Sequence, residues 1–323
     1  MWKKIFIAFG ILFLLLTGAA AYGIHIFNTS WFKEKPQYVS LKNDRTAFDF
    51  HFSAGEYGAT IEAHDLIKVP VRIKGVPQRF YLQWDTGSPY SLLYRRPLNS
   101  LKAQGFSWIE SEGFLLNVEI EIGNGSLAAD SFPIYENYGR TFEVTDSLRA
   151  IKLGTLGTDF MAGKICSIDF KNGKMEIYHE LPQWMEDSLH FEPFSFAGRR
   201  MMLPAVLDGK KHDLFYDSGS SAFGLITTKG RFEDYSEEGS DLIRYETNSW
   251  GNSIPICHKE TAMQMDMGGA TLPLARVSYI DMYTPVQSLL APFSKIGGWL
   301  GNKAFLEGKL ILDCQKEEFI VIR

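Results

Sequence analysis

The chain has 323 residues, enough for one large domain or for two domains of ordinary size around a substantial core. Its 45% hydrophobic and 22% charged residues lie close to globular averages, which excludes bulk disorder, collagen-like repeats and coiled coils. With 33 Lys and Arg against 38 Asp and Glu, the formal net charge is -5, and no basic stripe follows along the sequence, so we expect no nucleic-acid partner.

An apolar segment opens the chain. Residues 1–4 include Lys3 and Lys4, and residues 5–22 form an uncharged run that would extend roughly 27 Å as a helix, nearly the thickness of a bilayer core. We therefore expect a transmembrane anchor over residues 5–27, with residues 1–4 in the cytoplasm because lysines favour that side. A cleaved secretory signal is the alternative, since residues 19–21 are all alanine.

Both interpretations place the rest of the chain outside the cytoplasm. The body would be a periplasmic or cell-surface domain held by the anchor, or a secreted protein if the segment is cleaved. Residues 28–58 would then form a stalk and lead-in between the membrane and the body.

The body contains an internal repeat. In each copy, a segment that runs from a proline to a glycine leads into an apolar strand and then into Asp-[Ser/Thr]-Gly-Ser, over residues 70–88 and again over residues 204–220. An apolar strand, an alternating strand with a glycine turn, a Leu-Gly pair and a closing strand follow in both halves in the same order. These segments are residues 90–93, 118–123, 156–157 and 175–178 in the first half, and residues 223–226, 263–268, 300–301 and 319–322 in the second.

Short strands separated by Gly, Asn and Pro turns, with no long helical period, predict an all-β fold. Helix is expected only near residues 95–104 and 286–295. The repeat divides the body into an N-terminal β lobe of residues 59–185 and a C-terminal β lobe of residues 186–323, joined by a connector near residues 181–195. We expect a monomer with two pseudo-symmetric lobes and a site between them.

The other polar residues offer little alternative chemistry. Cys166, Cys257 and Cys314 are too few for a disulfide framework, and Cys166 and Cys314 are expected in different lobes and need not be bonded. The seven histidines show no metal-binding spacing, and no G-x-S-x-G motif indicates a serine hydrolase. We therefore expect no metal and no cofactor.

The duplicated tetrad is the candidate site. A single Asp-Thr-Gly-Ser would be weak evidence, because all four residue types are common in turns. Two copies at corresponding places would bring the carboxyl groups of Asp85 and Asp217 together where the halves meet. Two carboxyl groups a few ångströms apart cannot both ionise cheaply, so they share a proton and can act as acid and base.

Over about residues 60–323 the chain resembles the pepsin-like, two-lobed aspartic proteases, through both tetrads and through Thr155-Leu156-Gly157 and Trp299-Leu300-Gly301. The resemblance implies the bilobal aspartic protease fold, with Asp85 and Asp217 as the catalytic pair that activates a water to hydrolyse extended polypeptide. It also implies that the Leu-Gly pairs pack against the two catalytic loops; these residues are Leu156, Gly157, Leu300 and Gly301. The dyad would be supported by Thr86, Gly87, Ser88, Ser218, Gly219 and Ser220.

The resemblance also implies specific contacts. The hydroxyl groups of Thr86 and Ser218 should hydrogen-bond across the lobe interface. Ser88 and Ser220 should donate hydrogen bonds to the outer carboxylate oxygens, which favours the ionised form and would lower the pKa values of the dyad. Activity should then fall toward neutral pH, unless apolar burial raises those pKa values again.

The chain departs from this family in places. The first tetrad continues into Pro89 and Tyr90, without the family's second serine and the tryptophan after it. The flap hairpin that covers the site is expected within residues 106–116, with Trp108 as its candidate aromatic; Tyr135 and Tyr138 are the alternatives, and a second hairpin is expected around residues 244–258. A catalytically silent peptide-binding or regulatory module on the same scaffold is the alternative to an endopeptidase, because a fold does not fix a function.

Overall fold

The computed structural model describes residues 22–323 apart from residues 24, 27, 58–59, 144–148 and 282–295. The expected anchor over residues 5–27 therefore lies almost entirely outside the described residues, as does the helix expected at residues 286–295. Among the residues that are described, no helix is long and apolar enough to span a membrane.

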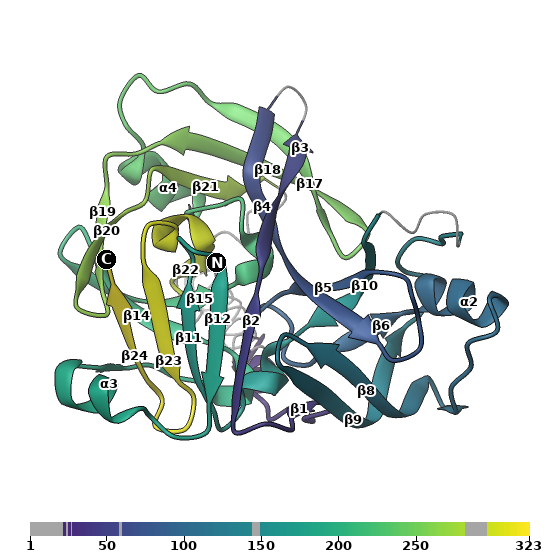
Figure 1. Ribbon diagram of the computed structural model, residues 1–323. Coiled ribbons are helices and arrows are strands. Elements are labelled where there is room, and N and C mark those ends of the chain that lie inside the picture. Colours follow the sequence, from purple (N-terminus) through teal and green to yellow (C-terminus); the bar gives the residue numbers. More distant parts are fainter. Residues whose placement is uncertain (1–21, 24, 27, 58–59, 144–148, 282–295) are drawn as a thin grey trace, which may run out of the picture.

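The body is built mainly from three β-sheets (Figure 1). The N-terminal sheet contains β1 (Ser40–Leu41), β3 (His51–Tyr57), β4 (Thr60–Ile73), β5 (Phe80–Trp84), β6 (Leu92–Tyr94), β7 (Glu110–Ser111), β8 (Phe114–Ile122), β9 (Gly125–Tyr135) and β10 (Ile151–Leu156). The C-terminal sheet contains β14 (Met202–Leu207), β15 (Lys210–Tyr216), β16 (Leu225–Ile226), β17 (Ile243–Ser249), β18 (Asn252–Glu260), β19 (Gln264–Met267), β20 (Ala270–Pro273), β21 (Arg276–Ile280) and β22 (Gly298–Leu300). The shared sheet contains β2 (Arg45–Asp49), β11 (Ile165–Asp169), β12 (Lys174–Tyr178), β13 (Glu192–Pro193), β23 (Lys309–Asp313) and β24 (Glu318–Ile322).

The helices of the described chain are short. The α-helices within residues 32–323, apart from the undescribed gaps, are α2 (Arg95–Ala103), α3 (Gln183–Ser188) and α4 (Lys229–Tyr235), and the 3₁₀ turns there are η2 (Thr158–Met161), η3 (Ala197–Arg199), η4 (Ser218–Ser220) and η6 (Asn302–Phe305). Helix α2 falls where a helix was expected, and the mostly β composition confirms the all-β prediction.

The repeated hairpin is present in both halves. In the first copy β4 and β5 pair antiparallel, with Pro70 opposite Tyr81, and in the second β14 and β15 pair in the same way, with Pro204 opposite Asp213. Each hairpin ends in an apolar segment, residues 80–84 of β5 and residues 214–216 of β15. Buried side chains of both segments pack into the largest core cluster of the described chain. The sequence repeat therefore corresponds to one structural unit built twice.

The shared sheet joins the two halves and the N-terminal segment. Strand β11 of the first half pairs with β23 of the second, and β12 pairs with β2. Residues 28–58 were expected to form a stalk and lead-in, but they contain β1, β2 and β3 and belong to the folded body. Pairing across the sheet, which no local pattern specifies, recruits this segment.

Two of the cysteines lie close together in the shared sheet. Cys166 and Cys314 come from different halves of the chain, but Cys166 lies on β11 and Cys314 follows β23, the strand that pairs with it. Cys314 donates its backbone N–H to the carbonyl of Lys164 at 2.9 Å. All three cysteines are free thiols.

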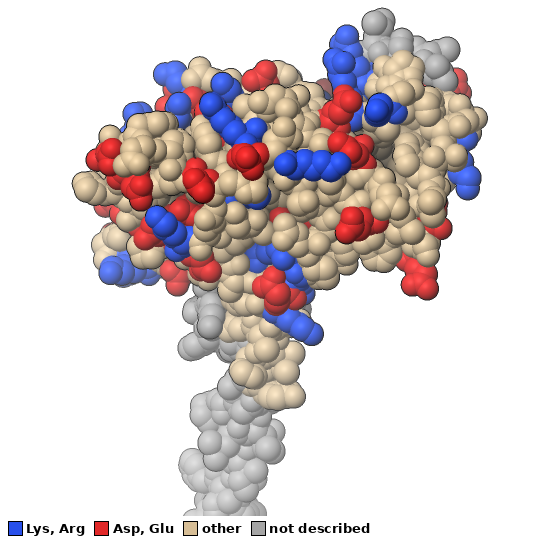
Figure 2. Space-filling model, turned by 60° about the horizontal axis from the view of Figure 1, so that its bottom comes forward, with Lys and Arg blue, Asp and Glu red and all other residues tan. Residues whose placement is uncertain are grey.

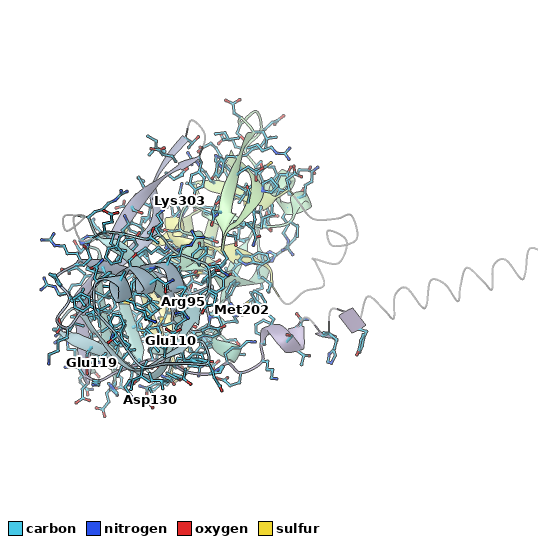
Figure 3. The ribbon with its side chains drawn as sticks, turned by 90° about the vertical axis from the view of Figure 1, so that its right-hand side faces the viewer. Arg95, Glu110, Glu119, Asp130, Met202 and Lys303 are labelled. Atoms are coloured by element: carbon cyan, nitrogen blue, oxygen red, sulfur yellow. The ribbon has the colours of Figure 1, made fainter. Side chains whose placement is uncertain are left out.

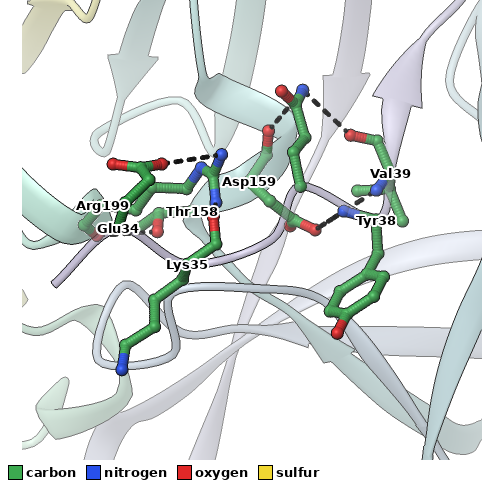
Figure 4. A network of polar contacts seen from close by, with 8 residues as sticks. Glu34, Lys35, Tyr38, Val39, Thr158, Asp159 and Arg199 are labelled. Carbon is green, nitrogen blue, oxygen red and sulfur yellow. Dashed lines mark hydrogen bonds and ion pairs between the residues drawn. The ribbon is translucent and has the colours of Figure 1, made fainter.

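The segment before β1 is bound to the body by polar contacts (Figure 4). The Arg199 guanidinium forms an ion pair with Glu34 at 3.2 Å and donates a hydrogen bond to the carbonyl of Lys35. The buried carboxylate of Asp159 accepts the backbone N–H groups of residues 38–39 at 3.2 and 3.3 Å. Because Asp159 follows the Leu-Gly pair of the first half, these bonds fix the N-terminal segment next to the candidate site.

Charged groups at the surface are mixed in sign. On the face seen in Figure 2, acidic and basic side chains alternate over the surface and do not gather by sign. On the face seen in Figure 3, Arg95 at the start of α2 contacts Glu110 of β7 at 2.5 Å and also pairs with Glu136 at 2.6 Å. These pairs hold the start of α2 against β7 and against the residue that follows β9.

Candidate active site

The two aspartates occupy equivalent positions at the ends of β5 and β15. In each half a parallel strand lies alongside: β10 pairs with β5 and β22 pairs with β15. The backbone N–H of Asp85 donates to the carbonyl of Leu156 at 3.0 Å, and that of Asp217 donates to the carbonyl of Leu300 at 2.9 Å. The same register in both halves therefore delivers both carboxyl groups to the place where the halves meet.

Each Leu-Gly pair packs tightly against its aspartate loop, as the resemblance implies. A Cβ added at Gly157 would lie 2.3 Å from the carbonyl oxygen of Tyr90, and one added at Gly301 would lie 2.2 Å from the carbonyl oxygens of Phe223 and Ser220. Only glycine permits this approach of two backbones. The contact holds both loops in the same conformation.

Reciprocal hydrogen bonds connect the two loops. The backbone N–H of Thr86 donates to the hydroxyl of Ser218 at 2.9 Å, and the backbone N–H of Ser218 donates to the hydroxyl of Thr86 at 2.8 Å. The Thr86 hydroxyl in turn donates to the carbonyl of Tyr216 at 2.8 Å, and the Ser218 hydroxyl donates to that of Trp84 at 3.2 Å. All of these groups are buried, so the bonds form in a low-dielectric interior where they are strong. The expected hydrogen bonding across the interface is present.

The two carboxyl groups lie within hydrogen-bonding reach of each other. A Cβ added at Gly219 would lie 2.5 Å from an oxygen of Asp85, and one added at Gly87 would lie 2.7 Å from an oxygen of Asp217 and 2.8 Å from one of Asp85. Each glycine therefore leaves the space that the carboxyl group of the opposite half uses.

The two serines that end the tetrads behave differently. Ser220 donates its hydroxyl to Asp217 at 2.9 Å, as expected. The prediction for Ser88 is wrong, because its hydroxyl donates to the carbonyl of Tyr90 at 2.6 Å and not to Asp85. The connection from Ser88 to Tyr90 is one residue shorter than the corresponding connection from Ser220 to Phe223. The Tyr90 carbonyl therefore lies close enough to accept a hydrogen bond from the Ser88 hydroxyl.

Burial raises the pKa values of both aspartates. Desolvation is the main cause for each, and the charge of Asp217 adds to it at Asp85, whose pKa is raised to about 7. Hydrogen bonds from the hydroxyl of Ser220 and from the backbone of Gly219 oppose the rise at Asp217 by favouring its ionised form. These hydrogen bonds favour the ionised form of Asp217, whereas the charge of Asp217 favours the protonated form of Asp85. Burial outweighs the hydroxyl contacts that were expected to lower both pKa values.

A cavity of about 760 Å³ surrounds the two carboxyl groups. Two hairpins contribute to its lining, β3–β4 from the first half and β17–β18 from the second, both labelled in Figure 1. Tyr57 at the end of β3 and Tyr245 on β17 have ring centroids 4.6 Å apart. The expected hairpin around residues 244–258 is therefore confirmed as β17–β18. The cover from the first half instead comes from a segment that precedes the first tetrad.

The flap candidate Trp108 does not reach this cavity. Its ring packs against the main core, and it is not among the described residues that line the site. The hairpin expected at residues 106–116 is only the short pair β7–β8. Of the alternatives, Tyr138 lines the cavity and packs on Trp250, whereas Tyr135 contacts that tryptophan from outside the lining.

An ion-pair network attaches the β3–β4 hairpin to the second half. Glu62 on β4 is buried and pairs with Lys303 at 2.6 Å and with Arg276. Burial alone would raise the pKa of Glu62, but the hydrogen bonds and charges of Lys303 and Arg276 outweigh it and hold this pKa below its ordinary value. Figure 3 labels Lys303 at the side of the molecule on which this hairpin lies.

Sequence reasoning missed several residues around the dyad. Trp31, from the presumed stalk, lines the cavity and lies 4.2 Å from the Arg200 guanidinium, which donates a hydrogen bond to the carbonyl of Gly87. Lys152 of β10 also lines the site. The sequence did contain one signal for the β3–β4 hairpin. Ile67, Val69, Val71 and Ile73 alternate with other residues, which indicates a strand that begins well before residue 70.

No grouping of three or more His, Cys, Asp or Glu suited to a metal ion occurs in the part of the chain that the structure describes. Comparison of the sequence with known proteins found no family model and no curated protein that matches it. Function must therefore be inferred from the site itself.

Proposed function

We propose that this protein is an aspartic endopeptidase of the pepsin-like, bilobal type, with Asp85 and Asp217 as the catalytic dyad. The observation that carries the proposal is the pair of buried carboxyl groups, presented by two copies of one loop and facing each other in a large cavity. Perturbed carboxyl pairs in clefts are typical of acid–base sites. The hydrogen bonds between Thr86 and Ser218 support it, because they hold the two loops in a fixed relation.

The electrostatics suggest a division of roles. Asp217, which accepts hydrogen bonds from Gly219 and Ser220, would be the ionised base that takes a proton from a water held between the carboxyl groups. Asp85, whose pKa is raised furthest toward neutral, would be the acid that donates a hydrogen bond to the substrate carbonyl and stabilises the developing oxyanion. The hydroxide attacks the carbonyl carbon, and collapse of the tetrahedral intermediate breaks the C–N bond as the leaving nitrogen takes up the proton that Asp217 accepted from the water.

The cavity suits an extended polypeptide as substrate. It runs beneath β3–β4 and β17–β18, whose backbones could pair with a strand-like peptide. We propose an enzyme that is monomeric, needs no cofactor and acts outside the cytoplasm, held to a membrane by residues 5–27 or secreted if that segment is cleaved.

The decisive experiment is binding of a statine-type peptide, whose hydroxyl mimics the tetrahedral intermediate, together with hydrolysis of a quenched peptide library. An endopeptidase should cleave the library, and the statine-type peptide should bind tightly in a 1:1 ratio and stop cleavage. Binding of peptides without any turnover would favour the silent peptide-binding module. Neither binding nor turnover, in protein shown to be folded by circular dichroism, would overturn the proposal.

The two serines allow a matched test of the pH profile. Ser220→Ala removes a donor to ionised Asp217, so the pKa values of the dyad rise and the rate maximum should move to higher pH by about one unit or less. Ser88→Ala is the control, because the Ser88 hydroxyl donates its hydrogen bond to the carbonyl of Tyr90 and not to an aspartate. The pH profile of this variant should match that of the native protein. The measurement is kcat/KM between pH 3 and 9 for both variants. Equal shifts in the two variants, or a shift of the Ser220→Ala profile toward acid, would contradict the assigned contacts.

A further inference from the structure

A second cavity of about 680 Å³ opens beside the one that holds the dyad. The two cavities share five wall residues, so the second is a side chamber of the first; these residues are Tyr94, Tyr138, Arg140, Lys152 and Asn248. A substrate bound at the dyad could therefore extend one side chain into this chamber.

The two cavities differ in charge, although both are lined by Arg140 and Lys152. The described wall of the side chamber has four cationic side chains and no acidic one; the cations are Arg96, Arg140, Arg149 and Lys152. The wall of the main cavity, in contrast, includes five acidic residues, which are Glu56, Asp65, Asp85, Asp217 and Glu246. None of the four chamber cations forms an ion pair with a carboxylate of the described chain.

Lys152 lies where the two cavities meet. Its side chain is partly buried. Its ammonium group donates a hydrogen bond to the side-chain carbonyl of Gln83 and lies 5.4 Å from the ring centroid of Tyr94. Burial lowers the pKa of Lys152 to about 8, against the opposing influence of Asp85 and Asp65, so the group is still a cation at neutral pH. A half-desolvated ammonium with one amide partner gains more from a carboxylate than an exposed lysine would.

The other chamber walls supply further donors. Tyr81 lies directly opposite Lys152 in the pairing of β5 with β10. Its hydroxyl is close enough to Arg140 and Arg149 for their charges to oppose the rise that burial causes in the pKa of Tyr81. Phenol, ammonium and guanidinium groups thus surround one space, and all of them can donate hydrogen bonds to an anion.

We propose that the side chamber is a specificity pocket that receives the carboxylate of an acidic side chain of the polypeptide substrate. This inference rests on the proposed endopeptidase function and specifies its substrate class: peptides with Glu or Asp at one fixed distance from the scissile bond. The carboxylate pairs with Lys152 and Arg140, where the two cavities meet, and with Arg149 further along the chamber wall.

The test is a scan of quenched peptides with blocked ends, in which Glu and Gln are compared at each position around the scissile bond. Blocked ends remove the terminal carboxylate, so only the side chain can respond. At one position Glu should raise kcat/KM about tenfold or more over Gln, as expected for a charge-assisted hydrogen bond. Lys152→Met should bring this Glu-to-Gln ratio close to one, whereas Lys152→Arg, which keeps the cation, should retain most of it.

Matched variants separate the pocket from general charge effects. Arg140→Gln and Arg149→Gln, at exposed positions where folding is not at risk, should each lower the ratio. Lys210→Gln removes an exposed cation of the C-terminal sheet outside both cavities and should leave the ratio unchanged. If Lys152→Met fails to fold, the two arginine variants decide the question.

The inference and the proposed function fail in different ways. Hydrolysis with a Glu-to-Gln ratio near one at every position would overturn the pocket and leave the endopeptidase intact. No hydrolysis of any peptide would overturn the endopeptidase, and fluorescence anisotropy with labelled Glu and Gln peptides would then test the pocket alone. Tighter binding of the Glu peptide to the native protein than to Arg140→Gln supports the pocket, and equal binding overturns it.

Discussion

Replacing either Asp85 or Asp217 by Asn should abolish peptide hydrolysis. An amide cannot serve as the base that takes a proton from water, nor return a proton as an acid, and either carboxyl group alone can fill only one of the two roles. Loss of positioned acid–base catalysis costs about 10²–10⁴-fold, and without the ionised carboxylate no group remains to take the proton from the attacking water. The measurement is kcat/KM on a quenched peptide for Asp85→Asn, Asp217→Asn and the native protein.

The fold should survive both changes. A carboxyl group whose pKa is raised in the folded state destabilises that state at neutral pH, so removing its charge should not lower the free energy of unfolding. Asp130→Asn, on an exposed position of β9 outside the cavity, is the control and should keep full activity. Substantial hydrolysis by either dyad variant, with the control unchanged, would show that the two carboxyl groups do not act as a pair.

Gly219→Ala should lower activity about 100-fold or more. The added methyl would lie 2.5 Å from one oxygen of Asp85 and 2.9 Å from the other, well inside van der Waals contact, so the carboxyl group must move. Asp85 has little freedom to do so, because its backbone is bonded to Leu156 and its side chain is buried. A displacement of about 1 Å in a reacting group can cost 10²-fold in rate.

A second glycine provides the control for this change. Gly230 in α4 has no neighbour within 4 Å of an added Cβ, so Gly230→Ala should keep activity and raise the free energy of unfolding by up to about 1 kcal/mol. Kinetics and urea unfolding of both variants give the comparison. Full activity in Gly219→Ala would mean that the carboxyl groups are not held as closely as the structure places them.

The covering hairpin shows where sequence patterns were insufficient. The alternation of apolar residues from Ile67 to Ile73 indicates a strand. No local sequence pattern predicts that β3–β4 lines the cavity of the dyad, or that Glu62 forms ion pairs with Lys303 and Arg276. Those contacts join residues more than 200 positions apart. Trp31 is a second example: it lines the cavity through contacts with residues far away in the chain, although the sequence analysis assigned its segment to a stalk.

The sequence by itself determined the all-β class, the doubled hairpin and the two loops that carry Asp85 and Asp217. Turn residues, strand alternation and the order of segments are local properties, and the repetition of that order defined the pairing of the halves. Only the tertiary structure decided which serine reaches a carboxylate, in which direction the pKa values of the two aspartates are shifted, and which cations line the side chamber. These depend on a one-residue difference in loop length, on burial and on distances between strands, all of which arise only when segments far apart in the chain pack together.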